Sequence, residues 1–183
     1  MRTKALLLLA GQQICLLGGL AVCVALRPAG LAANDGISYY SGYADTFPFY
    51  MFSLLGTGLF SYLAARLLTK PELRPLRYGL SAFAVLVAAI AFTPFFVSIY
   101  VDLAHTLVSI FMFVVQLALS IWLLVRLRWS AWAIIFICLE TIAGIVSVMY
   151  VLPSEGFLIQ GQVAFQVAFA ALLGYGFAKL LPA

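Results

Sequence analysis

Charged residues are scarce in this chain and make up only 9% of its 183 residues. Soluble domains carry roughly a quarter, so this composition, which is 66% apolar, excludes an ordinary soluble fold. The sequence holds a single histidine, and one histidine with scattered carboxylates gives none of the ligand spacings that fix zinc. It also lacks a phosphate-binding glycine loop and the CxxC, HExxH and Gly-x-Ser-x-Gly motifs. We therefore expect no metal site and no cofactor.

Long apolar stretches are what the sequence has in abundance. Each of six stretches is long enough to cross a hydrocarbon layer of about 30 Å at about 1.5 Å per residue. They cover residues 5–26, 47–68, 76–99, 103–126, 130–152 and 157–179. Little chain remains between them, so the sequence predicts a single all-α domain over residues 1–183, a polytopic transmembrane bundle of six helices.

The basic residues predict the orientation of this bundle. All lysines and arginines except Arg27 precede the first stretch, lie in or directly beside alternate gaps, or close the sixth stretch. Such residues are retained on the cytoplasmic side during insertion, so we predict a multi-pass protein of the cell membrane with both termini cytoplasmic.

The first stretch is longer than the apolar region of a signal sequence, and we expect it to be retained as a helix. The net charge of +4 is spread over short loops, which suits anionic lipid headgroups and not nucleic acid.

The connections between the stretches carry turn signals. Asn34-Asp35-Gly36 predicts a turn in the longest gap. The aromatic residues that follow it form either an interfacial belt or a short lid over the outer mouth of the bundle. Pro94 is expected to kink or end the third helix, Tyr100–Asp102 to form a tight link to the fourth, and residues 153–156 to close the outer side between the last two.

Small residues predict where the helices approach one another. In lipid, helix association relies on close contact between small side chains. Such residues line one side of the first stretch (Gly11, Cys15, Gly18 and Gly19) and of the second (Ser53, Thr57 and Ser61, beside Gly56 and Gly58). The three cysteines all fall within apolar stretches, and we interpret them as packing residues and not as a disulfide framework.

One group of polar residues lies at the middle of the bundle. Glu140 is ten residues after Ser130, which places it about 15 Å from the cytoplasmic edge, and Gln116 is expected at the same depth. With Gln166, Gln12 and Gln13 they can form one polar layer. Glu140 is either a protonated, hydrogen-bonded residue that holds helix register, or a proton-responsive, cation or ligand site.

A second group opens the fourth stretch. Asp102, His105 and Ser109 are spaced three and four residues apart, so a helix places them on one stripe. An aspartate one turn away is able to orient an imidazole as a general base. The stripe also fits a helix start with an interfacial histidine or a site for a ligand or lipid headgroup, and all three interpretations stay open.

The residues around the first outer loop resemble a known group of membrane proteins. Asn34-Asp35-Gly36-Ile37-Ser38-Tyr39-Tyr40, then Thr46-Phe47-Pro48-Phe49-Tyr50, and His105 at the start of the fourth stretch are similar to features of bacterial six-span families of unknown function. More distantly, the chain resembles the DRAM, Sfk and GPI-lipid-remodelling group. The resemblance implies membrane lipid handling and singles out Ser38, Asp45 and His105.

Three functions are compatible with these patterns. The leading hypothesis is a non-catalytic membrane protein that binds a lipid or other hydrophobic ligand, or a partner membrane protein, with a homo-oligomer as a further possibility. The second is a lipid-modifying enzyme that uses the outer site around Asp102 and His105. The third is a small proton-coupled transporter centred on Glu140 and Gln116.

Overall fold

The computed structural model describes residues 1–33, 35–149 and 157–182, and these residues form six α-helices. The described residues contain helices and connecting segments but no strand. The α-helices are α1 (Arg2–Leu26), α2 (Phe47–Leu67), α3 (Arg74–Ala91), α4 (Ile99–Arg126), α5 (Ala131–Met149) and α6 (Leu158–Leu180). Three short 3₁₀ helices, η1 (Pro28–Ala32), η2 (Gly36–Gly42) and η3 (Pro71–Leu73), lie in the connections.

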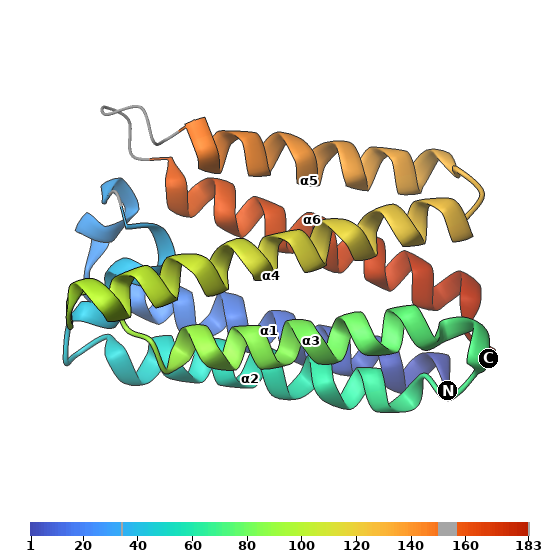
Figure 1. Ribbon diagram of the computed structural model, residues 1–183, viewed down its shortest axis with the longest axis horizontal. Coiled ribbons are helices and arrows are strands. Elements are labelled where there is room, and N and C mark those ends of the chain that lie inside the picture. The colour runs from blue at the N-terminus through green and yellow to red at the C-terminus, as the bar shows by residue number, and fades with distance from the viewer. Residues whose placement is uncertain (34, 150–156, 183) are drawn as a thin grey trace.

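Consecutive α-helices run in opposite directions, so both chain termini lie at the same end of the bundle (Figure 1). We call this the terminal end, and we call the opposite end, where η1 and η2 lie, the loop end. Five of the helices are long and apolar enough to cross a membrane, while α5 contains a shorter apolar segment, Ala131–Ser147. The chain is therefore an integral membrane protein with several membrane-spanning helices, and the predicted all-α helical bundle is confirmed.

The boundary between α3 and α4 differs from the prediction. The third helix ends at Ala91 and not near residue 99, and α4 already begins at Ile99. Pro94 follows the end of α3, as expected for a residue that cannot continue a helix. The prediction of a tight link at Tyr100–Asp102 was wrong, because the link is Phe92–Ser98 and these three residues lie in the first turn of α4.

Small residues bring α1 and α2 into close contact, as predicted. A Cβ atom at Gly19 would overlap the Ser53 hydroxyl oxygen, and one at Gly56 would lie 2.7 Å from Cys15. Gly18 is an exception and faces open space, since a Cβ atom there would meet no other atom within 4 Å. The hydroxyls on this face of α2 donate to carbonyls one turn earlier, so they bring no unpaired donor into the contact.

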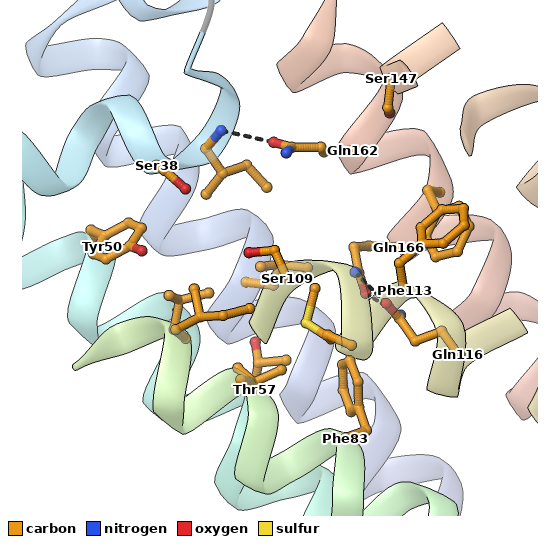
Figure 2. Close-up of a pocket in the computed structure, with 17 residues that line it drawn as sticks. Ser38, Tyr50, Thr57, Phe83, Ser109, Phe113, Gln116, Ser147, Gln162 and Gln166 are labelled. Atoms are coloured by element: carbon orange, nitrogen blue, oxygen red, sulfur yellow. Dashed lines mark hydrogen bonds between the residues drawn. The ribbon is translucent and has the colours of Figure 1, made fainter. Parts of the chain in front are cut away.

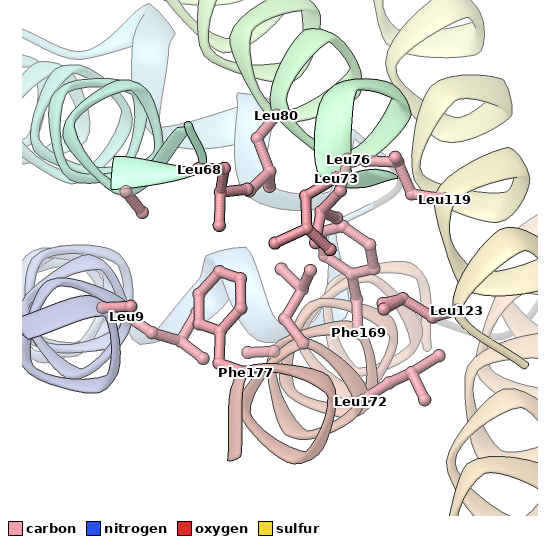
Figure 3. Close-up of a cluster of buried hydrophobic side chains, with 14 of the residues drawn as sticks. Leu9, Leu68, Leu73, Leu76, Leu80, Leu119, Leu123, Phe169, Leu172 and Phe177 are labelled. Atoms are coloured by element: carbon pink, nitrogen blue, oxygen red, sulfur yellow. The ribbon is translucent and has the colours of Figure 1, made fainter. Parts of the chain in front are cut away.

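Leucine and phenylalanine side chains fill the bundle near the terminal end (Figure 3). Phe169 and Phe177 of α6 lie at the centre of this cluster and are almost fully buried. A second buried cluster near the loop end includes Tyr40 and Tyr50.

Cys15 and Cys23 are buried, but Cys138 is exposed, so its prediction as a packing residue was wrong. The turn expected at residues 153–156 lies outside the described residues.

Candidate functional site

A cavity of about 170 Å³ lies inside the bundle, towards the loop end (Figure 2). All six α-helices and η2 contribute to its wall. Most of the wall is apolar, and its polar members are hydroxyl and amide side chains. They are Ser38, Tyr50, Thr57, Ser109, Gln116, Ser147, Gln162 and Gln166. None of the described residues that line the cavity carries a charge, so the site suits a neutral, partly apolar molecule.

Helix η2 closes the cavity at the loop end, and Ile37 and Ser38 form part of its wall. Two side chains of α6 form hydrogen bonds with the backbone of the loop that contains η1 and η2. The backbone N–H of Ile37 donates to Gln162 Oε1 at 2.8 Å, and Gln160 Nε2 donates to the carbonyl of Leu31 at 3.0 Å. Tyr40 is fully buried in the same loop. The position of η2 at the cavity fits the lid alternative, while the exposed Phe49 fits the belt alternative.

Ser38 and His105 meet at the cavity wall. The Ser38 hydroxyl oxygen lies 2.7 Å from His105 Nε2, and His105 Nδ1 lies 2.5 Å from the carbonyl oxygen of Thr93. A carbonyl oxygen only accepts hydrogen bonds, so Nδ1 carries a proton. In the neutral ring Nε2 is then the acceptor. Ser38 therefore donates its hydroxyl proton to Nε2. The ring is 2% exposed and packs edge-on against Phe95, which fixes its orientation.

Asp102 does not form the predicted hydrogen bond to the His105 ring. Its carboxylate instead accepts a hydrogen bond from the backbone N–H of Phe96 at 3.0 Å. Phe96 has a positive φ of 69°, a conformation that is uncommon for a residue with a side chain. Asp102 thus stabilises the turn before α4, while the carbonyl of Thr93 orients the imidazole.

Asp45, which the family resemblance singled out, lies away from the cavity wall. Its carboxylate accepts two hydrogen bonds from Arg27 Nε, at 2.9 and 3.1 Å. The Arg27 guanidinium holds the pKa of the Asp45 carboxyl below its usual range. Arg27 also lies over the ring of Tyr43, 3.9 Å from its centroid. This exposed group joins the end of α1 to the segment that leads into α2.

Gln116 and Gln166 form the polar floor of the cavity (Figure 2). Gln116 Nε2 donates to Gln166 Oε1 at 2.9 Å, and Gln166 Nε2 donates back to Gln116 Oε1 at 3.1 Å. No hydrogen bond extends this pair to the other members of the predicted polar layer, Gln12, Gln13 and Glu140. Gln12 and Glu140 are both buried, but neither lines the cavity, and the Gln12 amide nitrogen and the Glu140 carboxyl have no hydrogen-bond partner among the described residues.

Ser109 lines the cavity. Its spacing of four residues from His105 predicted that both lie on one side of α4. Four polar members of the wall were not predicted as site residues, and they are Tyr50, Thr57, Ser147 and Gln162. Gln162 is four residues before Gln166 on α6, so a search for glutamines on one helical face would have found it. Tyr50 was treated only as one of several aromatics, yet its hydroxyl is buried at the cavity without a partner among the described residues.

Comparisons with family models, curated proteins and solved structures found no match to this chain.

Proposed function

We propose that the protein binds a neutral amphipathic lipid in this cavity, with the apolar part of the ligand between the helices and a hydroxyl or ester group near Ser38 and Tyr50. The observation that carries this proposal is the cavity itself. Its volume of about 170 Å³ is similar to that of the roughly 150 Å³ engineered cavity that accepts benzene. A segment of about six carbon atoms therefore fits.

The polar groups of the wall support a neutral ligand. A charged headgroup transferred into the bundle would need an opposite charge, and the described wall residues offer none. The Tyr50 side chain is 1% exposed, and its hydroxyl has no protein partner among the described residues. A ligand oxygen that accepts a hydrogen bond from Tyr50 would satisfy this buried donor, which otherwise costs roughly 1–3 kcal/mol.

The orientation of the bundle follows from the basic residues. Arg2, Lys4, Lys70 and Lys179 all lie near the terminal end, whereas Arg27 lies at the loop end and is paired with Asp45. By the positive-inside rule the terminal end is cytoplasmic. The cavity then lies in the outer half of the membrane, where it receives lipid from the outer leaflet.

Cysteine labelling tests this orientation. In intact cells, a membrane-impermeant maleimide is expected to label an Ala32→Cys variant at the loop end and to leave a Lys70→Cys variant unlabelled, because only the loop end faces outwards. The unsubstituted protein provides the control for its own cysteines. Labelling of Lys70→Cys without Ala32→Cys would reverse the orientation.

Filling the cavity tests the binding proposal. Ser109→Phe places a ring in the cavity and is expected to weaken binding of 1-hexanoylglycerol at least about tenfold, which corresponds to about 1.4 kcal/mol. Binding is measured in nanodiscs by native mass spectrometry and by the ligand-induced rise in melting temperature. Thr106→Phe is the matched control, because Thr106 is an exposed residue on the same helix.

The control variant is expected to bind like the unsubstituted protein. Equal affinity of the two phenylalanine variants would show that the ligand lies elsewhere. Absence of binding by the unsubstituted protein would contradict the proposal for this class of ligand.

A further inference from the structure

We propose that Ser38 is a nucleophile and His105 its general base, and that together they cleave a carboxylic ester of the neutral amphiphile held in the cavity. The inference rests on the proposed function, since the cavity brings the ester to Ser38. It is carried by the geometry of three groups, the Ser38 hydroxyl, the His105 ring and the Thr93 carbonyl.

The hydrogen bonds give the neutral ring the tautomer that such a pair needs, with the proton on Nδ1 and Nε2 as the acceptor. A serine hydroxyl is activated when a neutral imidazole accepts its proton and a third group orients the ring. Here Ser38 Oγ lies 2.7 Å from Nε2, and the Thr93 carbonyl holds the proton on Nδ1. The backbone carbonyl of Thr93 thus orients the His105 ring, a role for which the sequence suggested Asp102.

The placement of the pair fits attack on a bound ligand. Ser38 lines the cavity, whereas His105 does not line it and is almost fully buried. The nucleophile therefore faces the ligand, and Nε2 lies directly behind its oxygen at 2.7 Å, within reach of the reacting atoms. The Tyr50 hydroxyl points into the same cavity (Figure 2) and is free to donate to an oxygen that becomes negative during the reaction.

The reaction proceeds in two steps. Ser38 Oγ forms a bond to the ester carbonyl carbon, and its proton moves to His105 Nε2. The bond from that carbon to the alkoxy oxygen then breaks, and Nε2 gives the proton to the leaving oxygen, so an alcohol departs. In the second step water gives a proton to Nε2 and forms a bond to the acyl carbon. The bond from that carbon to Ser38 Oγ then breaks, and Nε2 returns the proton to Oγ. The carboxylic acid leaves and the serine is restored.

A purely structural role is the competing interpretation. The same contacts also join η2 to α4, and a buried histidine with two hydrogen bonds is well satisfied. Structural tethering predicts no covalent chemistry at Ser38. Covalent labelling of the intact protein therefore separates the two interpretations.

The experiment uses a hexyl fluorophosphonate, whose phosphorus accepts an activated serine oxygen as fluoride departs. The full-length protein in nanodiscs is expected to gain one adduct, which tandem mass spectrometry places on Ser38. General-base activation contributes about 10²–10⁴-fold, so His105→Gln is expected to slow labelling at least about 100-fold. Ser38→Ala is expected to abolish the adduct. Ser61→Ala is the matched control, a buried serine away from the cavity that bonds only to the Thr57 carbonyl.

Binding of 1-hexanoylglycerol is measured in the same preparations. Ser38→Ala is expected to lose both the adduct and the release of hexanoate, while Ser61→Ala is expected to retain both. An unlabelled protein that binds the ester would overturn the nucleophile assignment and leave the proposed function intact. Labelling of Ser38→Ala at the original rate would also overturn it. A protein that is labelled at Ser38 but does not bind the ester would support the activated serine and contradict the proposed ligand.

Discussion

Replacing Gly19 by leucine is expected to lower the free energy of unfolding by roughly 3 kcal/mol, at the upper end of what overpacking costs. A Cβ atom at this position would overlap the Ser53 hydroxyl oxygen and lie 2.8 Å from the carbonyl oxygen of Phe49. The second atom belongs to the backbone, so a rotamer change cannot relieve the contact. The two helices would have to separate along their closest approach.

Gly18→Leu is the matched control, because no atom lies within 4 Å of a Cβ built at Gly18. This variant adds the same side chain to the neighbouring residue and is expected to change the free energy of unfolding by less than about 0.5 kcal/mol. Thermal unfolding in detergent or nanodiscs measures both. Equal destabilisation of the two variants would mean that α1 presents a different face to α2.

Replacing Gln116 by leucine is expected to cost about 1–2 kcal/mol of the free energy of unfolding. Gln116 is fully buried, and it exchanges two hydrogen bonds with Gln166. The single variant leaves the Gln166 amide without its partner in an apolar surrounding. The measurement is the free energy of unfolding in mixed micelles, with circular dichroism to confirm that the helices are retained.

The double variant Gln116→Leu/Gln166→Leu distinguishes pairing from simple loss of polarity. Removing both partners leaves no unpaired amide, so the double variant is expected to be more stable than either single variant. Strictly additive losses would show that the two glutamines act independently. In that case the floor of the cavity would not be a single hydrogen-bonded unit.

The sequence predicted most of the helix positions because charges and turn residues interrupt the apolar runs. Helices α1, α2 and α6 begin and end within a few residues of the predicted bounds. The exception is the link between α3 and α4, where Phe92, Phe95, Phe96 and Val97 continue the apolar run although the chain has left the helix. Hydropathy does not distinguish an apolar turn from an apolar helix, and only Pro94 marked the break.

The candidate site was predicted less completely, because its contacts join distant parts of the chain. Ser38 and His105 are separated by 67 residues, and no helical spacing relates them. The spacing of Asp102 and His105 predicted the wrong partner for the imidazole, since the carboxylate is needed by the turn at Phe96. The actual partner is a backbone carbonyl, a group that every residue has and that no sequence pattern reveals.

The contacts of α6 with the loop after α1 have a consequence for biosynthesis. The ribosome makes Ile37 long before it makes Gln162, and the backbone N–H of Ile37 depends on that side chain for its hydrogen bond. Phe165 and Gln166 of the same helix also complete the cavity wall. An emerging chain therefore has no complete cavity wall until α6 enters the membrane, and a chain released before α6 would reach the bilayer with an open interior.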